Sequence, residues 1–426
     1  MLENEKWDRT GKIVALAAFI GLVVDGMDLQ MLALSLPRIM KEMNISSVMG
    51  GALGTYTFVG MGIGGIFAGW LADRLGRVRV IFWSILTFSI FTSGIALSQE
   101  FWQIAAMRFI SGLGLGAVYG LGNLLAAEYA PTRIRTTVGG AMQAGWSVGY
   151  VLAALLSSYI LPNFGWRFLF AVAIIPGALA LCLLRNISDP PSWLAARQAA
   201  LMAGKRENEF VKIWSDKKMR VTLVLWIITS ISLQFGYYGA VSWLPSYLVK
   251  DLGVNLQKMG WYIAATYCAM IIGKLITGYL ADGLGRRALW VFCGLSTAVA
   301  LPVIMRYATP SSVAYLLLIF GLFYGAPWAI NSTYMNESYP TAVRGTAMSL
   351  SHNSGRIGAA ISPLVIGLVA SQYSISAGIA LLGITYFIAA LIPGIWIAEK
   401  MYDPKAGEVR GEAGTGIPAV KPATGR

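Results

Sequence analysis

The sequence contains few charged residues, one histidine and three cysteines. Charged residues make up only 12% of the 426 positions, about half the share found in an ordinary soluble domain. With so few charges, the chain cannot cover its own surface with groups that favour water. This shortage excludes a cytosolic enzyme, a nucleic-acid-binding protein and a disordered scaffold.

The scarcity of histidine and cysteine limits the chemistry that the chain can perform. Cys182, Cys268 and Cys293 lie in apolar stretches without the spacing of metal ligands, so we expect free thiols packed as small apolar side chains. One histidine, His352, cannot supply the usual ligand set or serve a full set of catalytic partners. We therefore expect no metal, no cofactor and no membrane-embedded hydrolase.

Long apolar runs are abundant, because 56% of the residues are hydrophobic and the mean hydropathy is +0.63. A helix that crosses the hydrocarbon core needs about 20 mainly apolar residues. Runs that meet this need lie at 13–36, 49–72, 79–98, 101–127, 138–161, 166–184, 220–246, 259–281, 288–308, 312–335, 345–371 and 376–398. Transmembrane strands would be shorter and would alternate, so the sequence predicts an all-α membrane protein with twelve transmembrane helices.

The basic residues predict how the chain is oriented. If both termini are cytoplasmic, the inner segments hold 24 of the 33 lysines and arginines, the outer loops hold 6 and the membrane holds 3. This bias follows the positive-inside rule and explains the net charge of +13 without nucleic acid. Residues 1–12 are polar and the first apolar run contains two aspartates, so we expect no cleavable signal. The predicted location is the inner (cytoplasmic) membrane.

Two short segments recur at one spacing. Residues 69–77 (GWLADRLGR) return as 278–286 (GYLADGLGR), and residues 128–135 (EYAPTRIR) return as 337–344 (ESYPTAVR), both after 209 positions. Two matches at the same offset indicate a duplicated six-helix unit in parallel orientation. Two such halves suit rocking around a site near the middle of the membrane.

The repeat and the hydrophilic stretches divide the chain into four predicted segments. These are an N-terminal six-helix bundle, a cytoplasmic linker, a C-terminal six-helix bundle and a cytoplasmic tail expected to be disordered, at 1–184, 185–219, 220–398 and 399–426.

The string at 69–77, with its weaker copy at 278–286, resembles the signature of the major facilitator superfamily. The resemblance implies the major facilitator fold and alternating access, with each half moving as a near-rigid body and cytoplasmic loops latching the outward-facing state. Charged residues in the repeated segments are the expected gates: Asp73, Arg77, Glu128, Arg135, Asp282, Arg286, Glu337 and Arg344. A permanent interfacial salt bridge with tight glycine turns explains the same pattern.

Three charged residues in the N-terminal half are expected inside the membrane, where such groups are costly and tend to mark proton relays. Asp25 and Asp28 stand three positions apart and share a helix face. Asp28 lies ~12 Å and Arg108 ~10 Å from the outer ends of their helices. If the two helices adjoin, as the resemblance implies, Arg108 neutralises one carboxylate while the other carries a proton. The alternative is a static buried ion pair.

A second pair of polar groups lies in the eleventh run. His352 and Arg356 share a face, and Arg356 lies ~16 Å from the cytoplasmic end, where the C-terminal half offers no acid at that depth. Arg356 is therefore the predicted anchor of a substrate carboxylate, although it could instead reach an aspartate of the first helix across the cavity. His352 either donates to the substrate, relays a proton or bonds a neighbouring carbonyl.

Aromatic residues near the expected cavity complete the predicted binding site. They could stack together on a ring, and they are Tyr119, Trp146, Tyr237, Tyr238, Tyr324 and Trp328. Lys274 lies one turn before the repeat at 278–286, so we expect it to have a structural role near the cytoplasm, snorkelling or reaching Asp282.

The substrate class is suggested by the first helix. The motif Asp25-Gly26-Met27-Asp28 resembles the signature of the aromatic acid:proton symporters, and Arg108 falls where those proteins carry a functional arginine. The resemblance implies proton-driven import of a benzoate-like anion or a ring-cleavage product such as muconate by a monomer in lipid. Short aliphatic carboxylates such as lactate need the same arginine and remain an alternative. A non-transporting sensor would tolerate loss of the aspartates, yet both are present.

Overall fold

The computed structural model describes residues 9–129, 135–185, 187, 189, 209–340, 343–399 and 401. Within these ranges the regular secondary structure is helical, without strands. Twelve candidate membrane spans occur in this described part of the chain. The predicted all-α architecture with twelve spans is therefore confirmed.

Each apolar run coincides with one span. In the N-terminal half the spans are α1 (Arg9–Glu42), α2 (Ser47–Leu75), α3 (Arg77–Gly94) with a 3-10 turn (Ile95–Leu97), α4 (Phe101–Tyr129), α5 (Arg135–Asn163), and α6 (Gly165–Val172) continued by α7 (Ile174–Leu184). After the short α9 (Glu209–Ser215), the C-terminal spans are α10 (Lys217–Lys250), α11 (Leu256–Leu284), α12 (Arg286–Tyr307), α13 (Val313–Tyr324) continued by α14 (Ala326–Asn336), α15 (Arg344–Gln372) and α16 (Ile375–Trp396).

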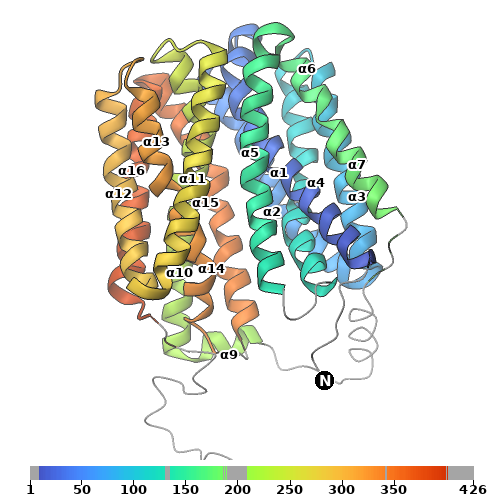
Figure 1. Ribbon diagram of the computed structural model, residues 1–426, viewed down its shortest axis with the longest axis vertical. Helices are drawn as coiled ribbons and strands as arrows, with labels where there is room; N and C mark the ends of the chain where they lie inside the picture. The colour runs from blue at the N-terminus through green and yellow to red at the C-terminus, as the bar shows by residue number, and fades with distance from the viewer. Residues whose placement is uncertain are drawn as a thin grey trace, which may run out of the picture.

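The two halves lie side by side, with α1–α7 on one side of Figure 1 and α10–α16 on the other. They meet where α2 packs on α15, α5 packs on α11 and α1 packs on α10. The second span of each half thus contacts the fifth span of the other. This reciprocal contact pattern is what a parallel duplication predicts.

The repeated segments form the same turn twice. Gly76 ends α2 with φ 105° and Gly285 ends α11 with φ 90°, backbone conformations that favour glycine. In the first turn the Asp189 carboxylate accepts a hydrogen bond from the backbone N–H of Val78 (2.7 Å). In the second, the Glu399 carboxylate accepts one from the backbone N–H of Arg286 (2.9 Å). An acid that follows each half's last span therefore caps the third helix of that half, where a negative charge is favourable.

The halves are in close contact toward one end and separate toward the other. Near the start of α2, the Thr55 hydroxyl donates to the Ala360 carbonyl of α15 (2.7 Å). Gly51 packs there against the backbone of Pro363. Toward the end that carries α9, a cavity opens between α2 and α15, with Ile66 and Leu350 among its lining residues. The molecule is thus open on the side of α9.

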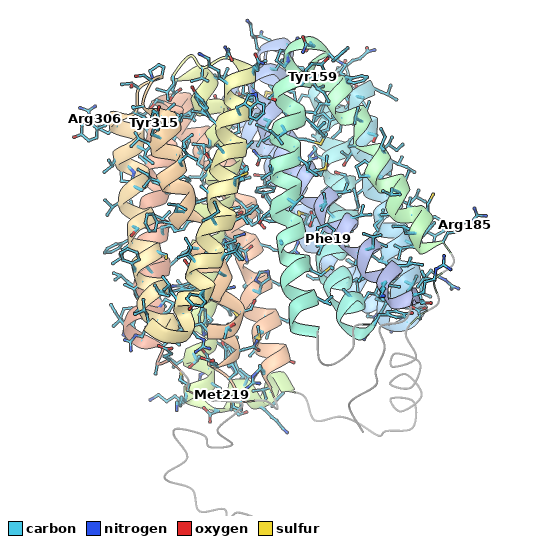
Figure 2. All side chains as sticks on the ribbon, in the orientation of Figure 1. Phe19, Tyr159, Arg185, Met219, Arg306 and Tyr315 are labelled. Carbon is cyan, nitrogen blue, oxygen red and sulfur yellow. The ribbon has the colours of Figure 1, made fainter. Side chains whose placement is uncertain are left out.

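The outward surface carries many apolar side chains, as Figure 2 shows. Leu275 and Tyr279 are each at least 70% exposed, which suits contact with lipid. The cysteines are free, as expected, but the prediction that all three are packed inside is wrong for Cys182 and Cys268, which are exposed. In a membrane the outer face is also apolar, so a small apolar side chain fits on either side.

Candidate transport site between the two halves

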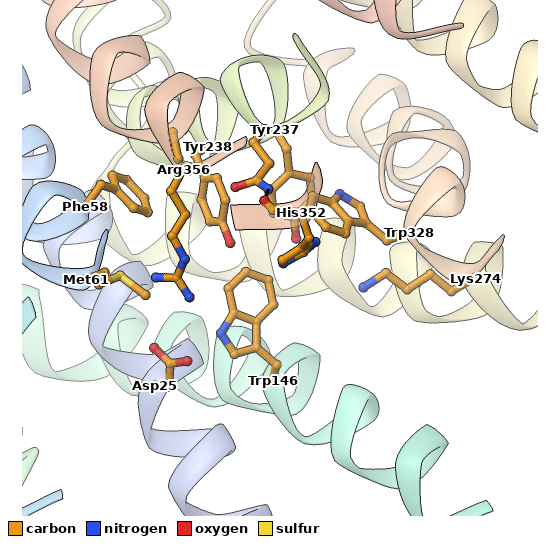
Figure 3. A pocket seen from close by; sticks show the side chains of 12 residues that line it. Asp25, Phe58, Met61, Trp146, Tyr237, Tyr238, Lys274, Trp328, His352 and Arg356 are labelled. Carbon is orange, nitrogen blue, oxygen red and sulfur yellow. Dashed lines mark hydrogen bonds between the residues drawn. The ribbon is translucent and has the colours of Figure 1, made fainter. Parts of the chain in front are cut away.

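A chamber lies between the halves, and its walls come from both of them (Figure 3). It encloses about 630 Å³ of empty space, part of which is continuous with the exterior. Its lining residues are Asp25 of α1, Phe58 and Met61 of α2, Trp146 of α5, Gln234, Tyr237 and Tyr238 of α10, Lys274 of α11, Trp328 of α14, and His352, Arg356 and Ala359 of α15.

Arg356 and Asp25 face each other across this chamber. Figure 3 shows the Arg356 guanidinium extending from α15 toward the carboxylate on α1, and the two charges interact electrostatically. Asp25 is only 1% exposed, and neither carboxylate oxygen has a hydrogen-bond partner among the described residues. The Trp146 indole nitrogen is directed at the carboxylate. The chamber thus contains a guanidinium and an aspartate that face each other without a direct ion pair among the described residues.

The second aspartate of α1, Asp28, is engaged through one of its carboxylate oxygens. Its Oδ1 accepts from the Arg108 guanidinium (2.9 Å) and from the Thr92 hydroxyl (2.6 Å). Arg108 also donates to the Thr57 hydroxyl (2.9 Å), and both charged side chains are at most 1% exposed. The equal depth expected for Asp28 and Arg108 is therefore realised as a direct ion pair. This pairing leaves Asp25 as the carboxylate on α1 that faces the chamber.

Asp28→Asn should destabilise the protein, because Arg108 would keep its buried charge without a carboxylate. Breaking a buried ion pair by removing one partner costs about 3–5 kcal/mol. We expect a clearly lower thermal unfolding midpoint in detergent. Asp25→Asn is the matched control, since this aspartate forms no direct ion pair among the described residues, and its midpoint should change much less. Equal midpoints for the two variants would contradict the assignment.

Aromatic rings form one wall of the chamber. The ring of Tyr237 lies 6.1 Å from that of Trp146 and 5.4 Å from that of Trp328, and Tyr238 meets Trp146 edge-on. Tyr324 lies behind this wall, stacked on Tyr237 at 4.8 Å. Tyr324 is not among the residues that line the chamber, so it contacts Tyr237 from behind and supports it. The Tyr119 side chain lies outside the described residues.

Two basic side chains besides Arg356, those of His352 and Lys274, line the chamber. His352 lies one turn before Arg356, and its ring is 6.0 Å from that of Trp328. Lys274 donates from its ammonium to the Ser147 hydroxyl of α5 (3.1 Å). The expected position of Lys274 near the cytoplasm is wrong, because α11 continues ten residues past it to Leu284 and places the ammonium ~15 Å from the helix end.

Sequence reasoning missed five lining residues, Phe58, Met61, Gln234, Lys274 and Ala359. Only Lys274 carried a signal that could have found it, namely a charge within an apolar run. Phe, Met and Ala are ordinary residues of a transmembrane helix. The described residues contain no group of three or more His, Cys, Asp or Glu that could hold a metal ion.

Some of the expected gate charges meet in the C-terminal half. Arg286 forms an ion pair with Glu337 (3.4 Å) and another with Glu399 (3.8 Å). Arg344 donates to the Tyr339 carbonyl (3.2 Å), and Arg77 begins α3. The side chains of Asp73, Glu128, Arg135 and Asp282 lie outside the described residues.

Comparison with known proteins agrees with this architecture. The family model of the Major Facilitator Superfamily matches residues 18–350 and 246–423. The cis,cis-muconate transport protein of Acinetobacter baylyi is 48% identical over 415 residues, which cover 95% of this chain and all of that protein. The benzoate transport protein of the same organism is 26% identical, covering 84% of this chain and 83% of that protein.

Solved structures show the same fold. A D-xylose–proton symporter superposes with a TM-score of 0.74 at 19% identity, over 91% of this chain and 98% of that one. The relatives thus include transporters of cis,cis-muconate and benzoate. The chain is therefore a multi-pass membrane transporter rather than an enzyme, and it belongs to the Major Facilitator Superfamily.

Proposed function

We propose that this protein is a proton-coupled symporter that imports an organic carboxylate by alternating access. The substrate is an aromatic acid or a ring-cleavage product such as muconate. The observation that carries the proposal is the pair of opposed charges, Arg356 and Asp25, in an aromatic-walled chamber between the two halves. The names of the muconate and benzoate relatives support the substrate class.

Arg356 is the proposed anchor. A guanidinium binds a carboxylate through two parallel hydrogen bonds, and no ion pair within the described residues occupies this one. The faces of Trp146 and Tyr238 then contact the ring or conjugated chain of the substrate. A short aliphatic carboxylate such as lactate would satisfy Arg356 but leave these apolar walls uncovered, so its affinity would be lower. His352 and Trp328 contribute to the same site.

Asp25 is the proposed proton carrier. While the site is empty, the Arg356 guanidinium faces the Asp25 carboxylate across the chamber and offsets its negative charge. When a substrate carboxylate takes over Arg356, the buried aspartate loses that stabilisation, and burial disfavours an uncompensated charge. Substrate binding and protonation of Asp25 therefore promote each other. Asp28 and Arg108 position α1 against α4 through their ion pair.

Orientation and movement complete the proposal. We place both termini in the cytoplasm and the protein in the inner membrane, because 24 of the 33 lysines and arginines fall in the segments that this orientation makes cytoplasmic. The protein would act as a monomer, in which segments 1–184 and 220–398 rock against each other as two bundles. The linker 185–219 joins them, and the tail follows at 399–426. The eight gate charges would then pair and separate during the cycle, with Arg286 and Glu337 paired in this state.

Uptake into proteoliposomes tests the function. With an inward proton gradient, purified protein should accumulate labelled cis,cis-muconate or benzoate above the external concentration, and lactate much less. A protonophore should abolish accumulation, because it removes the driving gradient. Transport that equilibrates and ignores the protonophore would indicate facilitated diffusion. Absence of transport for all three compounds would favour a non-transporting role.

A further inference from the structure

The chamber contains a second cationic side chain, that of Lys274, which has no role in the carboxylate anchor proposed for Arg356. Lys274 enters from α11, on a different wall from Arg356 of α15, and Figure 3 shows its ammonium directed into the chamber. Its stem packs close to Gly325, where α13 gives way to α14. The ammonium is therefore held in place from the C-terminal half and reaches across to Ser147 of α5.

The hydrogen bond to Ser147 leaves most of the ammonium unused. A lysine has three N–H donors, and the Ser147 hydroxyl takes one of them. No described carboxylate forms an ion pair with Lys274. Among the residues that line the chamber, Asp25 is the one acid, and Arg356 stands opposite it. A charged ligand group would supply the acceptor that Lys274 lacks.

We propose that the chamber recognises a dicarboxylate, with Arg356 binding one carboxylate and Lys274 binding the other. The aromatic wall formed by Trp146, Tyr237 and Trp328 covers the conjugated or cyclic segment between them. This inference rests on the proposed function, since it assumes carboxylate transport through this chamber. It adds that Lys274 selects substrates with two acidic ends.

Charge balance supports two carboxylates. With Asp25 protonated and His352 neutral, the chamber holds two positive charges, those of Arg356 and Lys274. A dianion then makes the occupied chamber neutral, whereas a monoanion leaves one positive charge without a counterion in a buried space. Because an uncompensated charge is costly when buried, a dicarboxylate fits the protonated chamber better.

The inference is tested with Lys274→Gln in purified full-length protein. Calorimetric binding is measured for cis,cis-muconate, a dicarboxylate, and for benzoate, a monocarboxylate. Loss of a hydrogen bond to a charged group should weaken muconate binding by roughly 10- to 100-fold, while benzoate, which has no second carboxylate for Lys274, should not bind more weakly. Lys274→Arg should keep most of the muconate affinity. Lys258→Gln, which removes an exposed charge from the same helix, is the matched control and should change neither.

Other results separate this inference from the proposed function. The dicarboxylate site is refuted if wild-type protein binds benzoate but not muconate. It is also refuted if Lys274→Gln weakens the binding of both compounds or of neither. In these cases the proposal of carboxylate transport stands. If wild-type protein binds neither compound, both proposals fail. Retained benzoate binding by Lys274→Gln also shows that the variant is folded, so a selective loss of muconate binding supports the inference.

Discussion

Arg356→Gln should raise the Kd for a carboxylate substrate by ~100-fold or more. The substitution removes both charge-assisted hydrogen bonds of the guanidinium, and each bond to a charged group contributes about 1.5–3 kcal/mol. It leaves a neutral amide on the same wall of the chamber, so the aromatic contacts are retained. Calorimetric titration of purified protein with benzoate or muconate measures the effect directly.

Arg356→Lys separates charge from geometry. A lysine keeps the positive charge but cannot bind a carboxylate through a planar fork, so we expect a strong loss of affinity that is smaller than that of Arg356→Gln. Arg306→Lys is the matched control, because Arg306 is exposed and points away from the molecule in Figure 2. Unchanged affinity in Arg356→Lys would move the anchor to another residue.

Asp25→Asn should abolish accumulation against a gradient while leaving substrate binding intact. The amide has nearly the shape of the carboxyl group, but it cannot gain or lose a proton during the transport cycle. Proton and substrate movements therefore become uncoupled. In proteoliposomes, uptake driven by an imposed proton gradient should stop at equal concentrations on both sides. Exchange of labelled for unlabelled substrate should continue, since it needs no net proton movement.

A control variant distinguishes this effect from general damage. Asp216 caps α10 through its side chain outside the membrane core, and asparagine caps a helix about as well as aspartate. Asp216→Asn should therefore accumulate substrate normally. Accumulation that persists in Asp25→Asn would assign the proton to another group of the chamber, with His352 the first to test.

The fold was predictable from the sequence because its determinants are local. Apolar runs of the right length mark the spans, and the repeat at 69–77 and 278–286 marks the duplication. Depth along a helix was also predictable from the rise per residue, which correctly matched Asp28 with Arg108. These features need no knowledge of how the helices are packed.

The composition of the chamber was harder to predict, because it depends on the direction in which each helix face points. Tyr237 and Tyr324 are both aromatic residues of buried helices, yet one lines the chamber and the other lies behind it. The position of Lys274 was predicted wrongly because its helix was expected to end at residue 281, whereas α11 continues to Leu284. Phe58 and Met61 reach the chamber only through the packing of α2 against α15, which no local pattern encodes.

The tyrosines behind the chamber have a consequence for how substrate range can change. The Tyr324 hydroxyl donates to the Tyr237 carbonyl (2.5 Å), and the Tyr386 hydroxyl donates to the Tyr324 carbonyl (3.2 Å). This chain of bonds braces the C-terminal half of the chamber, so widening it would leave buried hydroxyl groups without acceptors, which is costly. Descendants that acquire bulkier cargo should therefore vary in the N-terminal half, at Phe58, Met61 and Trp146, while the braced tyrosines persist.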